Sequence, residues 1–337
     1  MSFVIAAKGD LQLLPQFEPY DFAAYELYLG AIEQTVEQQL RLLPSHLTIT
    51  AAHTPGRVKI KNHLYPMNLC AHGEIGDASL ESLTALIEVC KRRGIKTIAV
   101  HAAMYDVATQ SKEEALQSLA QRVRPLLGRG VNLCFETDAL WFTRFNVQRS
   151  LLTGEDDFQK LDALLQGSLR ITADIEHLSF TFYLSQFIKN IGGESVFLEK
   201  YPEPDRLSFQ RDIQQFILAK YSFLQRQFYH FVAAFFQRFR SKIEHIHING
   251  TDCQNYIFNP QTTTGLPLLG EHLPLGFNHG TIQDRLDYSF LTQQFSVLPP
   301  DKQILIVMEV WRATPGEQLQ AIRYSKLLLE KQLGGKI

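Results

Sequence analysis

Short runs of apolar, β-branched residues alternate with amphipathic segments about eight times along this chain of 337 residues. Apolar strands separated by helices are typical of a parallel sheet that is buried on both faces. The strand candidates are residues 3–7, 23–29, 47–52, 95–100, 131–135, 169–173, 243–248 and 304–308. The helix candidates are residues 31–43, 79–93, 111–127, 156–165, 284–294 and 316–332. Eight such units predict a (β/α)8 TIM barrel rather than an open sheet.

Two of these helices carry recognisable end signals. Ser79, or the pair Glu81–Ser82, is a candidate start for the second helix, and Gly94 predicts its end. Ser111 precedes Glu114 by three residues, which is the spacing of a capping box at the start of the third helix. Both helices then lie between strands, as the alternation requires.

The segment between the sixth and seventh predicted strands is far longer than an ordinary crossover. A TIM barrel needs about 250 residues, so this chain has an excess on the order of 80. Residues 207–240 repeat aromatic and aliphatic side chains at helical spacing, with Gln, Arg and Lys between them. This pattern indicates a helix or helix pair packed on the barrel, with a lid or an interface between two copies as alternatives. We treat residues 1–337 as a single TIM-barrel domain with residues 178–240 as a helical insertion.

Charge and composition argue against several classes of protein. The formal net charge of −2 gives no sign of a surface built for nucleic acid or anionic lipid. No apolar run reaches the roughly 18 residues that span a bilayer, and residues 1–10 lack the pattern of a secretory signal. The four cysteines form no Cys-x-x-Cys pair, which favours a reducing cytoplasm. A Gly-rich dinucleotide fingerprint and a phosphate-binding Gly-x-x-x-x-Gly-Lys loop are both missing from the sequence.

Histidine and acidic residues stand where the predicted strands end. Active sites of TIM barrels lie at the carboxyl ends of the strands, so these residues are the first candidates for chemistry. The set comprises His53, His101, Glu136, Asp174 with His177, His247, His272 and Glu309. A lone histidine there is more often a hydrogen-bonded loop residue, and a lone carboxylate is often a helix cap. Loop hydrogen bonding and helix capping do not easily explain why so many such residues occur together at strand ends. Carboxylates together with an imidazole are suitable ligands for Mn²⁺, Co²⁺, Zn²⁺ or Mg²⁺.

The motifs around these residues resemble the xylose isomerase-like TIM-barrel superfamily. They are VHAAM, FETD, ADIEH, HIHING, EHLPLG and MEV, and the resemblance covers about residues 47–312 apart from the long insertion. The superfamily includes sugar isomerases, ketose 3-epimerases, inosose-processing enzymes and the endonuclease IV type of DNA-repair enzyme. Its Asp-x-x-His and His-x-Asn elements are fairly specific for the superfamily but are poor guides to the individual reaction.

The resemblance implies four ligands for a divalent metal: Glu136, Asp174, His247 and Glu309. It also implies that three histidines line the substrate side: His53, His101 and His272. His72 competes with His53 for that role, but His53 directly follows a clean strand. Glu136 and Glu309 would serve as acid and base, and His177 would orient a hydroxyl or polarise a carbonyl.

The implied reaction is an isomerisation or epimerisation of a sugar or polyol through an enediolate, which the metal stabilises as a Lewis acid. Some family members carry an arginine shortly after the strand that contains the His-x-Asn element, but residues 250–255 contain none. Arg312 could supply the cation instead, with a structural salt bridge as the alternative. The shortage of basic residues at the mouth favours an unphosphorylated substrate.

Other functions remain open. An endonuclease IV-like hydrolase would use the same residue set, but its pattern requires an aspartate where Gly270 stands, and a near-neutral chain releases few counterions on DNA. A barrel without catalysis could be a binding module with the aromatic insertion as its interface. Dehydration of a cyclic polyol or isomerisation of a hydroxy acid would need the same scaffold. A Schiff-base mechanism is disfavoured because no lysine ends a predicted strand.

Overall fold

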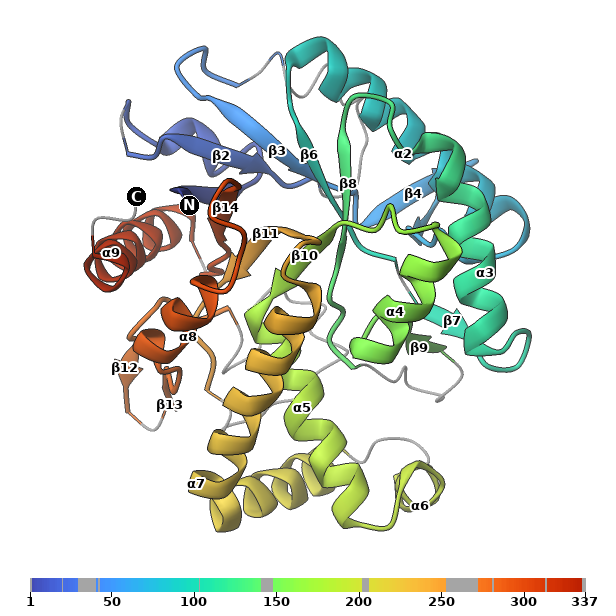
Figure 1. The fold of residues 1–337 in the computed structure, drawn as a ribbon, viewed down its shortest axis with the longest axis vertical. Helices are drawn as coiled ribbons and strands as arrows, with labels where there is room; N and C mark the ends of the chain where they lie inside the picture. Colours follow the sequence, from blue (N-terminus) through green and yellow to red (C-terminus); the bar gives the residue numbers. More distant parts are fainter. Residues whose placement is uncertain are drawn as a thin grey trace.

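Eight parallel strands of the described chain close into a barrel, in the order β1-β14-β11-β10-β8-β6-β3-β2 (Figure 1). They are β1 Ser2–Gly9, β2 Ala24–Leu27, β3 Ile49–His53, β6 Thr97–Val100, β8 Asn132–Glu136, β10 Ile171–Asp174, β11 Ile243–Ile248 and β14 Gln303–Met308. This computed structural model describes residues 2–19, 21–29, 41, 43–102, 104–140, 148–201, 206–252, 272–280, 282–312 and 314–334. The predicted (β/α)8 barrel is confirmed, and every predicted barrel strand overlaps an observed one.

Helices cover the outside of the barrel, and small antiparallel pairs lie beside it. Outside the crossover between β10 and β11, the helices are η1 Leu14–Gln16, α2 Gly73–Arg93, α3 Lys112–Val123, η2 Arg124–Leu126, α4 Glu155–Leu164, α8 Tyr288–Phe295 and α9 Pro315–Leu333. The pairs are β4 Arg57–Ile60 with β5 His63–Pro66, β7 Met104–Asp106 with β9 Gln148–Ser150, and β12 Asn278–His279 with β13 Ile282–Gln283. Among the described helices, none is both long and apolar enough to cross a membrane.

Two helix predictions have different outcomes. The capping box of Ser111 and Glu114 is confirmed at the start of α3, where each residue binds the backbone of the other. The helix expected over residues 31–43 lies outside the described residues, apart from residues 41 and 43.

The start of α2 differs from the prediction. The helix begins at Gly73, well before the expected start at Ser79, and it ends as predicted at Gly94, whose φ is +73°. Gly73 and Gly76 have low helix propensity, so the first turn of α2 could not be predicted from the sequence. Gly76 is nevertheless required, because a Cβ at this position would lie 2.0 Å from the carbonyl oxygen of Ala71.

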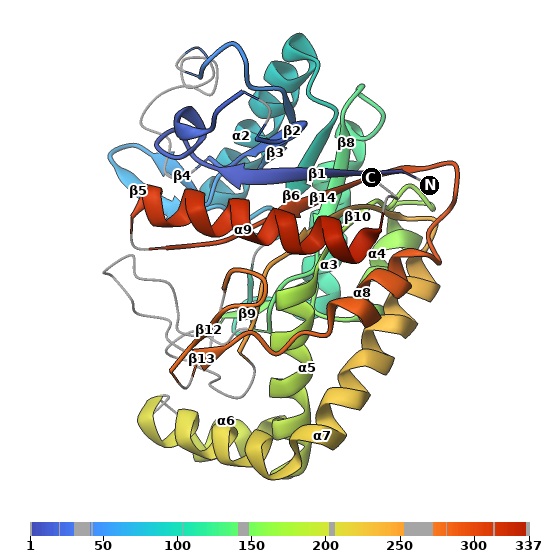
Figure 2. The ribbon, with the colours of Figure 1, turned by 90° about the vertical axis from the view of Figure 1, so that its left-hand side faces the viewer.

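A helical arm separates β10 and β11, the sixth and seventh barrel strands. It consists of α5 Ile175–Asn190, α6 Glu194–Lys200 and α7 Arg206–Phe239. Figures 1 and 2 show α5 and α7 side by side, leading away from the barrel to α6 at the far end. Aromatic rings join the two helices, since the Phe228 ring of α7 lies 5.7 Å from Phe182 and 5.9 Å from Tyr183 of α5. The predicted insertion is confirmed.

Strand alternation gives the barrel an apolar outer face and a partly polar interior. On β11, Ile246 and Ile248 belong to the large apolar core, whereas His245 and His247 contact carboxylates inside the barrel. A second, small apolar cluster fills the amino end of the interior: Val4, Ala6, Ala24, Leu305 and Val307. The carboxyl end of the interior is therefore left to charged side chains.

Candidate metal centre and its cavity

Four side chains from neighbouring strands converge inside the barrel. Glu136 ends β8, Asp174 ends β10, His247 belongs to β11, and Glu309 directly follows β14. One ligand atom of each lies within 4.8 Å of the others, and all four residues are buried. The structure thus brings together the four residues that the sequence singled out as metal ligands.

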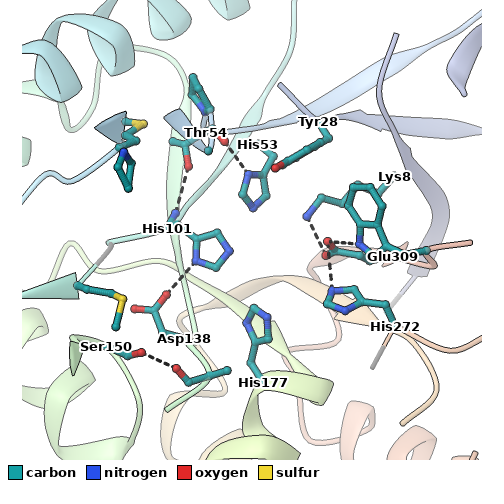
Figure 3. A pocket seen from close by; sticks show the side chains of 17 residues that line it. Lys8, Tyr28, His53, Thr54, His101, Asp138, Ser150, His177, His272 and Glu309 are labelled. Atoms are coloured by element: carbon teal, nitrogen blue, oxygen red, sulfur yellow. Dashed lines mark hydrogen bonds and ion pairs between the residues drawn. The ribbon is translucent and has the colours of Figure 1, made fainter. Parts of the chain in front are cut away.

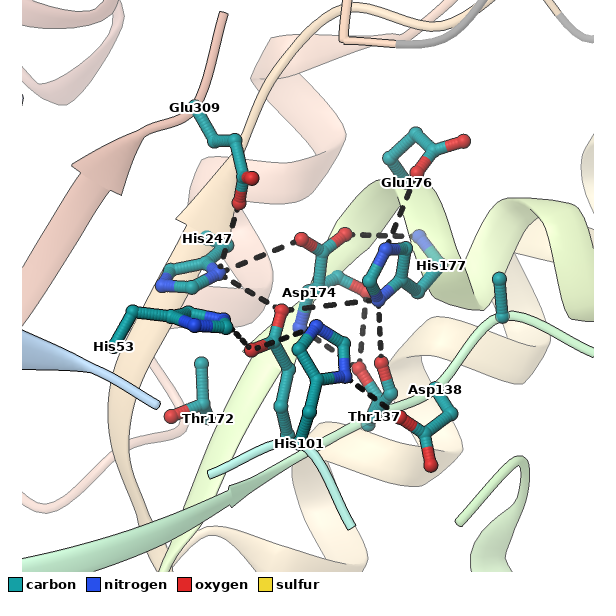
Figure 4. Close-up of polar contacts among 12 residues, drawn as sticks. His53, His101, Thr137, Asp138, Thr172, Asp174, Glu176, His177, His247 and Glu309 are labelled. Carbon is teal, nitrogen blue, oxygen red and sulfur yellow. Dashed lines mark hydrogen bonds and ion pairs between the residues drawn. The ribbon is translucent and has the colours of Figure 1, made fainter. Parts of the chain in front are cut away.

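The Nδ1 atom of His247 faces three carboxylates (Figure 4). It lies 3.0 Å from Glu136 Oε1, 3.3 Å from Glu309 Oε2 and 3.6 Å from Asp174 Oδ2. Asp174 Oδ1 accepts a hydrogen bond of 2.8 Å from the backbone N–H of His177, but buried Oδ2 has no hydrogen-bond partner among the described residues. Such buried negative charge needs a counter-charge. Three carboxylates and one imidazole fit a divalent cation.

The ionisation of these groups is interdependent. Burial alone would raise the pKa of Glu136, but His101 and His247 outweigh it and hold that pKa well below its usual range. Burial opposes the charged form of His247 too, yet Glu136 and Glu26 raise its pKa well above the ordinary value. The stability of the interior therefore depends on pairing between charges rather than on any single group.

A cavity of about 440 Å³ lies beside this cluster (Figure 3). That volume falls in the range of small-molecule sites. Its wall includes Glu309 and the four histidines that the sequence placed at the mouth: His53, His101, His177 and His272. His72 is not part of this wall and instead stands at the N-cap of α2, so His53 is the better placed of the two.

His53 and His101 share contacts with Glu136. The Nε2 atom of His53 lies 3.0 Å from Glu136 Oε2, and Nε2 of His101 lies 3.5 Å from the same oxygen. These three residues form a second group whose ligand atoms lie within 4.8 Å of one another. Burial disfavours the charged form of His101, but Glu136 and Asp138 raise its pKa to about 9. His101 therefore brings a positive charge to the cavity at neutral pH.

His177 and His272 approach the cluster from the other side of the cavity (Figure 3). The Nδ1 atom of His177 lies 2.7 Å from the carbonyl oxygen of Thr137, which fixes the ring. The Nε2 atom of His272 lies 3.4 Å from Glu309 Oε1. His272 has a φ of +47°, a backbone conformation that is uncommon for a residue with a side chain and that often occurs at functional sites.

A family model described as a xylose isomerase-like TIM barrel matches residues 17–326. The chain belongs to this family. No curated protein has a significantly similar sequence.

Solved structures with a similar fold cover almost the whole chain. One is mannonate dehydratase from Streptococcus suis serotype 2, with a TM-score of 0.59, 10% identity, and coverage of 100% of this chain and 95% of that one. Another is the IOLI protein with a binding zinc atom, with a TM-score of 0.57, 11% identity, and coverage of 99% of each chain. A third is D-psicose 3-epimerase in the presence of D-fructose, with a TM-score of 0.54, 12% identity, and coverage of 98% and 100%. At these identities the likeness shows the fold alone.

Two buried charged residues of this xylose isomerase-like barrel were missed in the sequence. Lys8 lies near the carboxyl end of β1 and Glu26 lies on β2, and both are buried. The signal was their register, since Lys8 continues the inward series of Val4 and Ala6, and Glu26 follows Ala24 by two residues. The prediction that no lysine ends a predicted strand was wrong, because Lys8 directly follows the predicted strand 3–7 and lies one residue before the end of β1.

The environment of Lys8 supplies a different argument against a Schiff base. Its Nζ atom donates a hydrogen bond of 2.7 Å to Glu309 Oε2 and lies 3.7 Å from Glu26 Oε1. Burial would lower the pKa of Lys8, but the two carboxylates outweigh burial and raise it above the ordinary value. A Schiff-base lysine needs a free amine, which these ion pairs disfavour. Lys8 is therefore a fixed cation in the cavity wall.

Arg312 lies away from that wall. Its guanidinium stacks over the ring of Phe277 at 4.8 Å and donates to the carbonyl oxygen of Trp311 at 2.9 Å. Trp311 itself lines the cavity and donates from Nε1 to Glu309 Oε1 at 3.3 Å. Contact between Arg312 and a substrate stays a prediction.

Proposed function

We propose that this chain is a divalent-metal-dependent isomerase or epimerase that acts on a sugar or polyol. The observation that carries the proposal is the buried cluster of Glu136, Asp174, His247 and Glu309 at the edge of a cavity lined by histidines. The similar folds of D-psicose 3-epimerase and L-ribulose 3-epimerase support the same class of substrate. The four residues would hold the metal.

When bound, the ion supplies a Lewis acid for the oxygens of a hydroxy-ketone or hydroxy-aldehyde. Glu309 contributes to the cavity wall, whereas Glu136 is fully buried and is not part of it. We therefore assign the first proton transfer to Glu309, which removes the proton from the carbon next to the carbonyl group. The electron pair of that C–H bond forms a carbon–carbon double bond while the carbonyl oxygen takes up negative charge. Glu136, paired with the protonated His101 of the cavity wall at 3.5 Å, would then supply a proton. In epimerisation this proton goes to the opposite face of the same carbon and the carbonyl group re-forms. In isomerisation it goes to the former carbonyl carbon, while the hydroxyl proton of the neighbouring carbon moves to the former carbonyl oxygen. The proton on Glu309 and the one lost by the Glu136–His101 pair exchange with solvent before the next turnover.

The histidines orient the substrate in this scheme. His177 lines the cavity, and its Nδ1 atom is already engaged with Thr137 at 2.7 Å. Nε2, which lies 3.7 Å from Glu176 Oε2, is therefore the atom that would contact a hydroxyl or carbonyl oxygen. His101 is held by Asp138 at 2.9 Å and donates to a second hydroxyl, and His53 and His272 close the wall on either side. The two cations of the described wall are already paired, Lys8 with Glu309 and His101 with Asp138 and Glu136, which favours a substrate without a phosphate group.

Metal analysis of the purified protein, followed by a screen of ketoses and inososes, tests the proposal. We expect about one divalent ion per chain, and with that ion restored we expect exchange of one carbon-bound proton with solvent, read by NMR in D₂O. Asp174→Asn should lose both properties, because it removes a charged ligand whose Oδ2 atom accepts no hydrogen bond from the described residues. Purified protein that neither contains nor binds a divalent ion would contradict the proposal and favour a binding module instead.

A second candidate is a metal-dependent phosphodiester hydrolase. The second group of candidate ligands, His53, His101 and Glu136, favours it, because hydrolases of this kind use two or more adjacent metals. The net charge of −2 disfavours it, since binding to DNA is driven largely by phosphate contacts. Metal-dependent nicking of DNA that contains an abasic site would support this candidate over the first.

A further inference from the structure

Glu26 is a buried carboxylate that is neither in the proposed ligand set nor in the cavity wall. Its Oε2 atom lies 3.3 Å from His247 Nε2 and 3.0 Å from His245 Nε2, and its Oε1 atom lies 3.7 Å from Lys8 Nζ. A buried carboxylate is costly unless such partners surround it. The barrel therefore holds a negative charge next to the Nε2 atom of His247.

The two nitrogens of His247 face different groups. Nδ1 lies among the carboxylates of Glu136, Asp174 and Glu309, and Nε2 faces Glu26. A neutral imidazole carries one proton, so one nitrogen donates and the other has a free lone pair. Carboxylates face both nitrogens, but a cation that takes the lone pair of Nδ1 leaves the single ring proton on Nε2, where Glu26 is placed to accept it.

We propose that Glu26 is a positioning residue that makes His247 a metal ligand, by holding the ring proton on Nε2 and leaving the Nδ1 lone pair for the ion. The inference rests on the proposed function, because it concerns the metal centre of that function. A metal-bound histidine commonly donates its other N–H to a carboxylate, which orients the ring and strengthens the ligand.

The surroundings of Glu26 fix it for this role. His245 lies on the same strand as His247 and on the same face, and their rings are 4.8 Å apart at 82° to each other. His245 Nδ1 lies 3.2 Å from the hydroxyl of Thr172 on β10, so its ring is held on both sides. Lys8 bridges Glu26 and Glu309. Partners on β1 and β11 thus flank Glu26 and hold it beside His247.

Calorimetric titration of metal-free protein with Zn²⁺ alone tests this role without a substrate. Glu26→Gln keeps the shape but replaces the carboxylate by an amide whose NH₂ can face Nε2 and drive the proton to Nδ1. We expect zinc affinity to fall by about 10–100-fold. The matched control is Glu244→Gln on β11, because Glu244 pairs with Arg170 and Lys302 and has no contact with His247. The control should bind zinc like the wild type.

A spectroscopic measurement distinguishes a role of Glu26 in positioning the His247 ring from a general loss of structure. In long-range ¹H–¹⁵N spectra at a fixed, sub-saturating zinc concentration, the His247 ring should show Nδ1 bound to zinc with its proton on Nε2, and Glu26→Gln should show this form in a smaller fraction of molecules. Should Glu26→Gln fail to fold, Glu26→Asp retains the charge but withdraws it by roughly one carbon–carbon bond, about 1.5 Å. Zinc affinity should fall in that variant as well.

Two outcomes would overturn the proposal, and they can be told apart. If the wild type binds zinc and the Glu26 variants bind it equally well, Glu26 has no positioning role and the proposed function stands. If the wild type does not bind zinc or any other divalent ion, the proposed function fails and the role of Glu26 fails with it.

Discussion

The interior of the barrel and the helical arm bury opposite kinds of side chain. Near the carboxyl ends of the strands, Lys8, Glu26, Glu136, His247 and Glu309 are buried against one another and stabilised by mutual pairing. In the arm, aromatic rings of α5 and α7 are buried against one another and need no counter-charge. Changes in the interior should therefore alter metal binding and turnover, whereas changes in the arm should alter stability alone.

The largest effect is expected for Glu309→Gln in the barrel interior. The amide keeps the shape of the side chain but cannot accept the substrate proton, so turnover should fall by about 10²–10⁴-fold or more. Secondary structure should be unchanged by circular dichroism, because Lys8 retains Glu26 as a nearby carboxylate. Turnover at the wild-type level would remove Glu309 from the mechanism.

The arm should respond in the opposite way. Phe228 is fully buried and contacts both Phe182 and Tyr183, so Phe228→Ala should lower the free energy of unfolding by about 3–5 kcal/mol. Zinc affinity of the folded protein should not change. Phe223, on the same helix but 55% exposed, is the matched control, and Phe223→Ala should cost about 0.5 kcal/mol or less. A large loss of zinc affinity in Phe228→Ala would show that the arm and the metal centre are coupled.

The same contrast explains what could be predicted from the sequence. The barrel could be predicted because the strands are apolar runs, six of which carry a histidine or an acidic residue at the carboxyl end. Glu136 and Asp174 end their strands in the structure as well. Glu26 was missed because only the strand ends were considered, whereas inward direction depends on the register of alternation along the strand. Lys8 directly follows the predicted strand 3–7 and was missed because only histidine and acidic residues were sought there. Whether His53 or His72 reaches the cavity depends on distances that no spacing in the sequence records.

The arm was predicted from the length of the segment between the sixth and seventh strands and from its helical periodicity, in less detail than the barrel. Periodicity shows which face of a helix is apolar but not what covers it, so it could not join α5 to α7. The insertion was predicted to begin at residue 178, but its first helix already begins at Ile175, because Asp174 ends a strand and caps the following helix at once. Asp174 is both the last residue of β10 and the N-cap of α5. A prediction that assigns each residue to a single segment cannot find such a direct junction.

A partly buried carboxylate in the segment between β13 and α8 belongs to neither of these two groups of side chains, and it gives the smallest expected effect. Asp284 accepts hydrogen bonds from the neutral N–H groups of Gly276, Leu286 and Thr251, at 2.6, 3.1 and 3.2 Å. Burial raises the pKa of Asp284 to about 6, even though these hydrogen bonds oppose the shift. The corresponding pKa in the unfolded chain is about 3.9, so the folded state binds this proton more tightly.

The contribution of Asp284 to stability is therefore fully present below about pH 4 and is lost as the pH rises through about 6, with a total near 3 kcal/mol. Asp284→Asn should lack this dependence. Other groups titrate in the same range, so the measured quantity is the difference in free energy of unfolding between the wild type and the variant, from urea denaturation at pH 4 to 7. That difference should shift in favour of the variant as the pH rises. A difference that is constant over this range would show that neutral donors compensate the buried charge as fully as the ion pairs do in the barrel.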